Sequence, residues 1–426
     1  MIGSLLLISC SVLGQADDAN ASDKLGLEVR RLAKQLDDDS LEKRQAAEKE
    51  LIELGPDALK LLPPITRHTS AEVKLRLDRV RKALETSAAK AAAEASTVTL
   101  EGDMLLSEAF AALEKQTGNK IMDFRAQFRQ ERTDPTVTAS FDKTTFWVAL
   151  DRLLDQANLT VYNFSGREGV VAFVGRNERE RDRADRGTYS GLFRFEGVAA
   201  YARRDLRNPQ NDSLKLEIEV AWEPRLTPIV LQLDLPEQRA IADTGEVVAV
   251  DSRQSRLEIP VESSIAAAEL PVPLMLPNRS VKKLTSLKGK LSALVPGRVE
   301  TFEFENLEGA KAVEQQKAGV TVILDQVRKN VDLFEVRVRV RFDKAENALE
   351  SHRGWIYNNE AYLLDPDGKK LDNDGYQAYR QDVNEIGVAY LFDREAGLKG
   401  CKLVYKTPVL IMKIPVEYEL KDIDLP

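Results

Sequence analysis

The segment EVRVRVRF, residues 335–342, decides the fold class of the second half of this chain. Valine alternates with arginine along it, so an extended strand would carry apolar side chains on one face and charges on the other. A period of two is typical of an antiparallel strand that has one face in a core and one in water. The segment therefore predicts a sheet of half-buried strands.

The second half of the chain contains this pattern twice. The segment SLKLEIEVAWEP, which begins at 213, parallels LFEVRVRVRFDK, which begins at 333. The segment that ends at Leu307 likewise parallels the one that ends at Ile423. Each copy holds several short alternating segments, a pattern typical of β-sandwiches. We therefore expect two duplicated antiparallel β-sandwich domains, residues 188–307 and 308–426.

Arg337, Arg339 and Arg341 form a row on the polar face of the segment 335–342, and Glu417 and Glu419 form a row near the C-terminus. If the two strands are neighbours, arginine and glutamate face each other across the ladder, and each pair contributes about 0.2–1 kcal/mol. Charge pairing is favoured because charged outer faces are ordinary on half-buried strands. Contact between two domains of complementary charge and binding of an acidic ligand are the alternatives.

The composition is that of a globular protein with several domains. A chain of 426 residues is longer than the about 250–300 residues at which a single core stops growing. The net charge of -8 argues against nucleic acid as a partner, because nucleic-acid binding favours a basic surface. Two histidines and two cysteines are too few for a Cys/His zinc site, and the chain has no nucleotide-binding or nucleophile motif. We expect no metal, no cofactor and no enzymatic activity.

The first residues, MIGSLLLISCSVLGQADDA, resemble the apolar core of a secretory signal. Their apolar run is shorter than the about 20 residues that span a bilayer. Three interpretations remain open: a signal peptide over residues 1–16 that is cleaved after Ala16, a bacterial lipobox in LISC with lipidation of Cys10, or the start of a buried helix. The first two place the protein in the periplasm or cell envelope, with peripheral or lipid-anchored membrane association as one outcome.

Residues 20–90 have the periodicity of helices. The recurring apolar residues are Leu25, Val29, Leu32 and Leu36, then Val73, Leu77, Val80 and Leu84. A break at Gly55-Pro56 separates the helices, and the pattern of helix, LG, proline and AL..LL resembles a HEAT-type repeat. The resemblance implies a segment that docks proteins. Because such repeats usually need three or more neighbours to be stable, a small helical cap or a hairpin that docks a partner is the alternative.

Residues 97–175 alternate between strands and helices in the order β-α-β-β-α-β-β. The segments FAALEKQTG, at 110–118, and ALDRLLDQAN, at 149–158, resemble the short N-terminal domain of secretins and TonB-dependent receptors. The resemblance implies a small split α/β domain that docks a protein partner. The charged run that follows, residues 176–187, is expected to be a solvated linker.

The segment ESHRGWIYNNEAYLL, residues 350–364, is the candidate for a ligand-binding surface. Aromatic faces stack on sugars or peptides while amides and carboxylates orient them. The candidate residues are Trp355, Tyr357, Asn359 and Tyr362. Core packing of the aromatic residues is the alternative and is the commoner role of such rings.

Together these patterns favour an exported, non-enzymatic protein–protein interaction or scaffold component of the bacterial cell envelope, with a protein partner there. A carbohydrate- or cell-wall-binding protein that uses the aromatic residues of the second sandwich is the alternative. A glycoside hydrolase with Glu350 and Glu360 as its carboxylate pair is the least favoured. The expected fold class is multi-domain α+β: a helical segment, a split α/β domain and two β-sandwiches.

Overall fold

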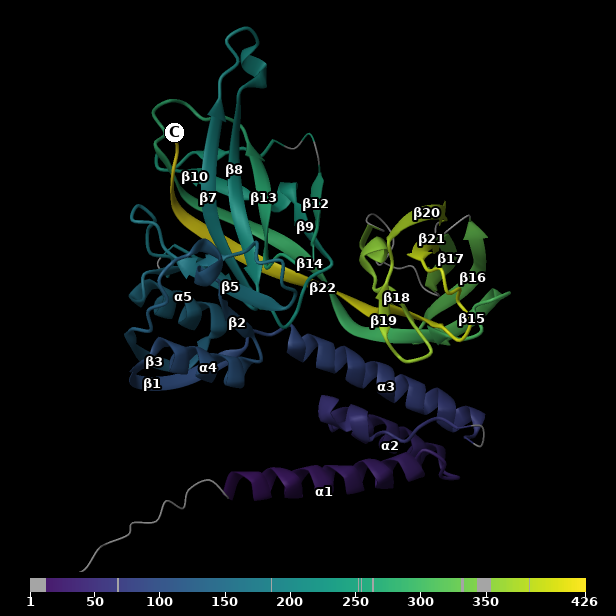
Figure 1. Ribbon diagram of the computed structural model, residues 1–426. Helices are drawn as coiled ribbons and strands as arrows, with labels where there is room; N and C mark the ends of the chain where they lie inside the picture. Colours follow the sequence, from purple (N-terminus) through teal and green to yellow (C-terminus); the bar gives the residue numbers. More distant parts are fainter. Residues whose placement is uncertain are drawn as a thin grey trace, which may run out of the picture. The chain divides into compact units, whose positions relative to one another are not determined.

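The computed structural model describes residues 13–66, 69–184, 186–251, 253, 255–262, 264–330, 333–342, 354–382 and 384–426. The fold is mixed α+β, with more strands than helices, and the strands form several mostly antiparallel sheets (Figure 1). This confirms the predicted class, a β-rich α+β fold. The chain divides into two compact units, Met1–Ala91 and Ala92–Pro426. All the strands that the structure describes belong to the second unit. Among the described helices, none has the length and apolar character needed to cross a membrane.

The first unit is helical. Its elements are α1 (Leu13–Gln35), α2 (Leu41–Glu53), the 3-10 helix η1 (Pro56–Leu61) and α3 (Ala71–Ala92). Gly55 lies between α2 and η1 at a φ of 82°, a conformation that glycine adopts without steric cost, so the helix ends at the predicted break. The core contains Val29 and Leu32 of α1, Leu51 of α2 and Leu77 of α3. These residues lie on the apolar faces that the helical periodicity predicts.

The second unit begins with a small α/β domain. Its elements are β1 (Thr97–Leu105), α4 (Leu106–Thr117), β2 (Lys120–Asp123), η2 (Arg125–Phe128), β3 (Thr136–Thr145), α5 (Phe146–Gln156), β4 (Leu159–Tyr162) and β5 (Val170–Gly175). Strand β1 pairs with β3, and a three-stranded sheet has the order β2-β5-β4, in which β2 is parallel to β5. Gly118, at a φ of 74°, ends α4. The order of strands and helices is the order read from the sequence.

The remaining strands form three sheets. Their bounds are β6 (Thr188–Ser190), β7 (Phe193–Arg203), β8 (Ser213–Trp222), β9 (Val230–Asp234), β10 (Arg239–Ala242), β11 (Val247–Val248), β12 (Arg256–Pro260), β13 (Ala267–Leu274), β14 (Lys283–Phe304), β15 (Lys311–Lys317), β16 (Val320–Asn330), β17 (Leu333–Phe342), β18 (Ala361–Leu364), β19 (Lys370–Asp372), β20 (Gly375–Gln381), β21 (Glu385–Asp393) and β22 (Lys402–Asp424). Two outer sheets have the orders β13-β8-β7-β6 and β15-β16-β17-β21-β20. The third sheet is built around β14 and β22. Short 3-10 turns are η3 (Pro209–Asn211), η4 (Leu235–Glu237) and η5 (Gly354–Asn358).

The long strands β14 and β22 run side by side through both sandwich-like packings (Figure 1). Their antiparallel register extends from Lys283 opposite Asp424 to Phe304 opposite Leu403. The first half of β14 and the last half of β22 contribute to one core, and the remaining halves contribute to the other. The two packings therefore do not coincide with the predicted ranges 188–307 and 308–426, because the last strand of each range continues into the core of the other.

The charged run 176–187 is anchored rather than free. Residues 177–182 are exposed, but Arg176 forms ion pairs with Asp155 and Asp182. Arg183 is buried, with its guanidinium 2.9 Å from Glu219. The expectation of a solvated linker therefore fails for these two arginines, because carboxylates on α5 and β8 pair with them.

A buried ion pair joins the α/β domain to the first outer sheet. Arg194 of β7 donates from Nε to Asp151 Oδ2 of α5 at 2.5 Å, and both side chains are fully buried. The Tyr189 hydroxyl donates to the same carboxylate at 2.8 Å, and Glu196 lies 2.8 Å from Arg194 Nη1. Burial, together with the Asp151 charge, raises the pKa of Tyr189. Next to the pair, Trp147 Nε1 donates to the Leu192 carbonyl at 3.1 Å.

A second cluster ties the start of β1 to the end of β8. The Glu223 carboxylate, almost fully buried, accepts hydrogen bonds from Ser96 N and Oγ at 2.8 and 2.6 Å. It also accepts one from Asn119 at 3.0 Å and one from Arg225 at 2.7 Å. Because the Asp151–Arg194 pair and the Glu223 cluster are both buried, the α/β domain and the first outer sheet are packed together as one body. Removal of the α/β domain or of the sheet would leave buried charges unpaired.

We expect Asp151→Leu to lower the free energy of unfolding by about 3–5 kcal/mol, because it leaves the buried Arg194 charge without its main partner. The double variant Asp151→Leu/Arg194→Met should recover most of this loss, since an apolar pair needs no compensation. Urea unfolding measures both values. Asp142→Leu, at an exposed aspartate, is the control and should change little. Equal losses in the single and double variants would contradict the role of the ion pair.

Gly289 of β14 lies where the backbone and an aromatic ring approach closely. An added Cβ would lie 1.7 Å from Gln238 Oε1 and 2.7 Å from the Tyr418 ring. The Tyr418 hydroxyl donates to the same Gln238 oxygen at 2.6 Å, and the ring stacks on Phe195 at 4.8 Å, so neither neighbour can move away freely.

Gly289→Ala should therefore destabilise the protein by about 1–3 kcal/mol through overpacking. In Gly197→Ala, the matched control on β7, the new methyl group meets nothing within 4 Å. The control should leave the unfolding midpoint unchanged or slightly raised. Equal unfolding midpoints for the two variants would show that Gln238 and Tyr418 can repack.

Candidate functional site

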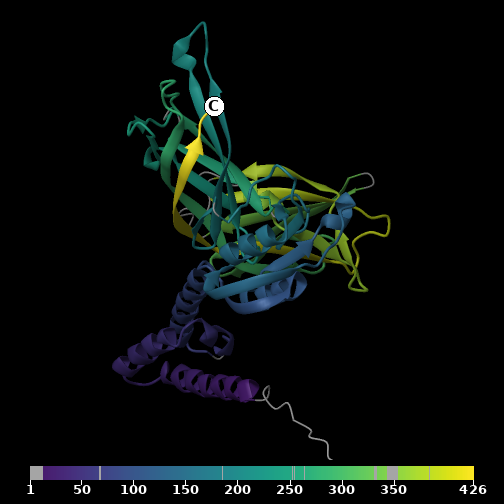
Figure 2. The ribbon, with the colours of Figure 1, turned by 90° about the vertical axis from the view of Figure 1, so that its left-hand side faces the viewer.

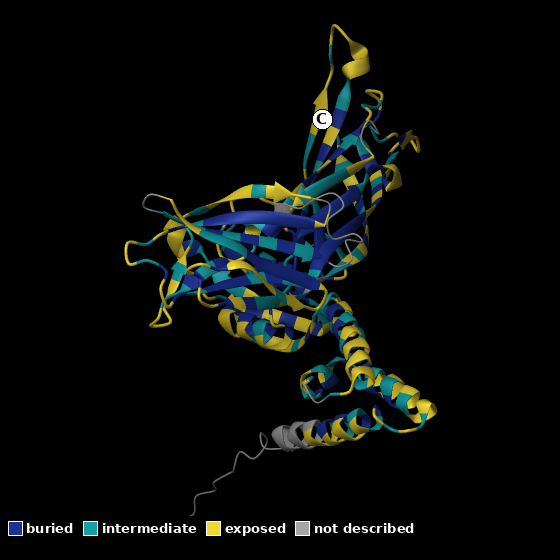
Figure 3. Ribbon diagram, turned by 90° about the vertical axis from the view of Figure 1, so that its right-hand side faces the viewer, coloured by how far each residue is buried: buried dark blue, intermediate teal, exposed yellow. Residues whose placement is uncertain are grey.

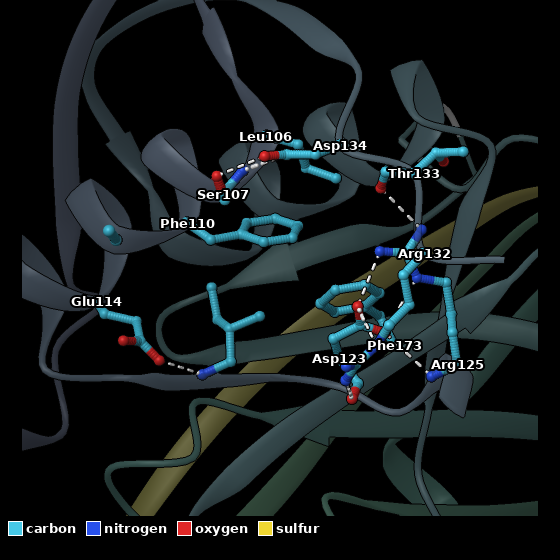
Figure 4. A pocket seen from close by; sticks show the side chains of 12 residues that line it. Leu106, Ser107, Phe110, Glu114, Asp123, Arg125, Arg132, Thr133, Asp134 and Phe173 are labelled. Atoms are coloured by element: carbon cyan, nitrogen blue, oxygen red, sulfur yellow. Dashed lines mark hydrogen bonds and ion pairs between the residues drawn. The ribbon is translucent and has the colours of Figure 1, made fainter. Parts of the chain in front are cut away.

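A groove of about 400 Å³ opens on the α/β domain, between α4, the edge strand β2 and the loop that leads to β3 (Figure 4). Its floor is apolar. Leu106 and Phe110 come from α4, Ile121 from β2 and Phe173 from β5, and the rings of Phe110 and Phe173 lie 5.1 Å apart. The floor residues belong to the domain core or pack against it, so the groove has a firm base.

Arg125 forms one wall of the groove and is held rigidly. Its guanidinium donates to Asp123 from Nε at 3.0 Å and from Nη2 at 2.8 Å, a bidentate pair (Figure 4). Nη1 donates to the Thr133 carbonyl at 3.0 Å, and the guanidinium lies 5.5 Å from the centre of the Phe173 ring. Burial by itself raises the pKa of Asp123, but the bonds from Arg125 outweigh it and hold that pKa below its ordinary value.

Asp134 forms the opposite wall and caps the start of α4. Its two carboxylate oxygens accept hydrogen bonds from Ser107 N at 2.9 Å and from Ser107 Oγ at 2.7 Å. These bonds lower the pKa of Asp134. The first amides of a helix lack partners within the helix and carry partial positive charge, so a carboxylate is favourable there. The loop before β3 is thereby tied to α4.

The charged groups of this groove act as hydrogen-bonding groups around an apolar floor. Asp123 and Asp134 both have lowered pKa values, so they are ionised at neutral pH and act as hydrogen-bond acceptors rather than general acids. The rim carries both signs of charge, and Arg132, whose side chain is 57% exposed, is the guanidinium best able to turn towards a ligand. An apolar floor with a mixed polar rim suits a segment of polypeptide.

The aromatic candidates are not gathered on one exposed face. Trp355 is 7% exposed and packs in the second core, with its ring 5.7 Å from that of Phe342. Residues 354–358 form the 3-10 helix η5 instead of a strand, so the expected alternation is lost. For Trp355 the core interpretation is therefore correct, because a 3-10 helix points this ring inward.

The other three candidates have separate partners. Tyr357 stacks on Tyr376 with 5.7 Å between ring centroids. Asn359 donates to Tyr405 Oη at 2.8 Å, and Tyr362 lies under the ammonium of Lys370 at 4.7 Å. These contacts use the polar and aromatic groups that a glycan would need.

Of the proposed carboxylate pair, Glu360 forms an ion pair with Lys406 at 2.8 Å. Glu350 and the candidate lipidation residue Cys10 lie outside the described residues. The pair therefore has no described geometry, and the described partner of Glu360 is a lysine.

The arginine row does not face the glutamate row. Strand β17 lies between β16 and β21, whereas the segment of β22 with Glu417 and Glu419 pairs with β14. Lys290 lies 3.3 Å from Glu417, and Lys288 lies 3.5 Å from Glu419. The prediction that these strands are neighbours is wrong, because the long β14–β22 ladder takes β22 into the other packing.

The three arginines have carboxylate partners of their own. Arg337 pairs with Glu335 at 2.5 Å, and Arg341 pairs with Glu314 at 3.3 Å. Arg339 pairs with Asp325 at 2.9 Å and with Glu385 at 3.0 Å. Their charges are therefore compensated within the second outer sheet.

The groove residues were largely missed by sequence reasoning. The helix segment 110–118, which resembles part of a docking domain, supplies Phe110 and Glu114 to the lining. The rim residues of the loop 125–134 had no local signal, because that loop is simply polar. Among the described residues, no group of three or more histidine, cysteine, aspartate or glutamate side chains could hold a metal ion.

Comparisons of the chain with protein-family models, with curated proteins and with solved structures find no match. The resemblances to HEAT-type repeats and to the short N-terminal domain of secretins and TonB-dependent receptors thus stay predictions from the quoted residues.

The Asp134 cap should make α4 sensitive to acid. The folded pKa lies below the unfolded value of about 3.9 for aspartate, so its stabilisation is present above that pH and is lost as the pH falls through the folded value. The gap in unfolding midpoint between wild type and Asp134→Asn should therefore be largest near neutral pH and narrow below about pH 4. Urea titrations at a series of pH values measure it. A gap independent of pH would show that the cap needs no charge.

Proposed function

We propose that this protein is an exported, non-enzymatic interaction component of the bacterial cell envelope, which docks a partner protein in the groove of its α/β domain. The observation that carries the proposal is the open groove of about 400 Å³ with an apolar floor and fixed charges of both signs. Its volume lies within the roughly 300–1,000 Å³ of ligand sites. The matching ligand is a segment of polypeptide with an apolar side chain flanked by charges.

The rim supports a peptide rather than a simple anion or cation. Arg125 uses its donors on Asp123 and on backbone carbonyls, and the two Asp134 oxygens each accept one hydrogen bond from Ser107. A rim with charges of both signs has no strong net pull on a free ion, while Asp134 and the exposed Arg132 can still bond to a chain that brings both donors and acceptors. The apolar floor would supply most of the affinity, and the rim would supply orientation.

Three features of the sequence support the same function. The segments 110–118 and 149–158 resemble a domain that docks proteins in secretins and TonB-dependent receptors. The helical residues 20–90 resemble HEAT-type repeats, which also bind proteins. The first 16 residues resemble an export signal, with lipidation at Cys10 as the alternative.

The test blocks the groove without disturbing the core. Ala111 of α4 is exposed and lines the groove, so Ala111→Arg fills it with a long side chain at a position where helix propensity is kept. Ala91→Arg makes the same change at an exposed alanine of α3, outside the α/β domain. We expect Ala111→Arg to reduce capture of cross-linked envelope proteins from intact cells at least tenfold, while Ala91→Arg captures the wild-type set.

Mass spectrometry identifies the captured set, and a melting curve shows that each variant is folded. Equal capture by wild type and Ala111→Arg would rule out the groove as the docking site. Deletion of residues 97–175 is a poor test, because it would leave Arg194 buried without Asp151.

A further inference from the structure

The hairpin between β7 and β8 carries a leucine that packs against nothing. Leu206 is 94% exposed at the end of the hairpin, which projects beyond the neighbouring strands in Figures 1 and 2. The strand β13 pairs with β8 only up to Leu214, so the loop 204–212 extends past the end of its sheet. Figure 3 shows this projecting end largely as exposed residues.

The hairpin end is a defined structure rather than a loose loop. Asp205 Oδ1 accepts the backbone N–H groups of Arg207 at 3.0 Å and Asn208 at 2.9 Å. Asp212 Oδ1 accepts the N–H of Asp205 at 2.8 Å, which closes the base of the loop. Asp212 also forms an ion pair with Arg204, whose Nη1 lies 3.4 Å from Asp212 Oδ2. The acidic groups of the loop thus bond to residues of the loop itself, and Leu206 is presented on a fixed turn.

A second loop lies against the first. Arg204 Nη2 donates to the Pro277 carbonyl at 3.4 Å, which joins the hairpin to residues 275–282. That loop presents Met275, 47% exposed, and the exposed cations Arg279 and Lys282. We call residues 203–212 and 275–282 together the basic tip.

The basic tip has a charge opposite to that of the chain. It holds five basic residues against two acidic ones, Asp205 and Asp212, in a chain whose net charge is -8. The basic residues are Arg203, Arg204, Arg207, Arg279 and Lys282. Asp243 also lies beside the tip, where it accepts the backbone N–H of Lys282 at 3.2 Å. Cations on an edge strand can simply discourage aggregation, but that role does not account for an exposed leucine at the tip.

We propose that the basic tip is a membrane-docking element that binds the surface of an anionic phospholipid bilayer. Leu206 would enter the interface, and the arginines would contact lipid phosphates. A convex tip fits a deformable bilayer surface, whereas a protein partner would have to provide a matching pocket. This inference is independent of the groove, which lies on the α/β domain.

The first test uses the full chain with Leu206→Trp. The three native tryptophans, Trp147, Trp222 and Trp355, are all buried, so a new tryptophan at 206 reports on the tip alone. Its emission should shift to the blue on addition of phosphatidylglycerol/phosphatidylcholine vesicles and stay unchanged with phosphatidylcholine alone. Val313→Trp, at an exposed valine on β15, is the control and should not shift.

The second test removes charge from the tip. Arg203→Gln/Arg204→Gln/Arg207→Gln should weaken binding to the anionic vesicles about 100-fold in a co-sedimentation assay. Each basic side chain near an anionic membrane makes a similar contribution to the binding affinity, so the loss of three lowers it by about two orders of magnitude. Lys311→Gln/Arg328→Gln/Lys399→Gln removes the same charge from exposed positions elsewhere and should leave binding nearly unchanged.

No blue shift with anionic vesicles, or equal losses in the two triple variants, would overturn the proposal. A shift with phosphatidylcholine alone would overturn the part assigned to the arginines. If the vesicles do not bind and the tip variants instead lose affinity for a purified acidic envelope protein, the basic tip is a protein-docking surface and the lipid proposal is wrong.

Discussion

The pairing of β14 with β22 is the constraint on which the rest of the second unit depends. The ladder keeps one register, apart from a shift near Pro296, from Lys283 to Phe304, and both strands cross from one core to the other. Tyr418 and Leu420 of β22 lie in the first core, whereas Phe302 and Phe304 of β14 lie in the second. Because each core takes half of each strand, neither packing can be complete without the other.

The exchange of strands also supports the proposal of an internal duplication. The two outer sheets have the same central arrangement. In one, the hairpin of β7 and β8 pairs with the later strand β13, and in the other, the hairpin of β16 and β17 pairs with the later strand β21. Asn306 and Asp422, which correspond when the segments ending at Leu307 and Ile423 are aligned, both have a positive φ, 53° and 51°. Non-glycine residues adopt this conformation rarely, so its recurrence at matched positions is informative.

The groove is presented on a domain that is fixed to this framework. Charged groups are buried between the α/β domain and the first outer sheet: Asp151 pairs with Arg194, and Glu223 bonds to Ser96 and Asn119. A purely apolar contact would fix the relative orientation of the two parts less strictly. Buried ionic groups contribute little net stability, but they penalise every alternative arrangement in which they are unpaired. The proposed docking would gain from this, because a partner would then meet a base of defined orientation.

The sequence by itself determined the local structure. Periods of two predicted the half-buried faces of β8 and β17, helical spacing predicted the core faces of α1 and α3, and Gly55 marked the end of α2. The strand and helix order of residues 97–175 could be read in the same way. These features depend on neighbours along the chain, whose spacing is fixed by the geometry of helix and strand.

Only the tertiary structure decided which surfaces meet. Periodicity shows that Arg339 lies on a polar face, but its partners Asp325 and Glu385 are set by strand pairing. The same holds for the inward turn of Trp355, for the anchoring of Arg183 and for the rim of the groove, where Arg125 meets Asp123 and Thr133. Pairing between distant segments depends on the packing of the whole chain, and one strand's pattern is compatible with many partners.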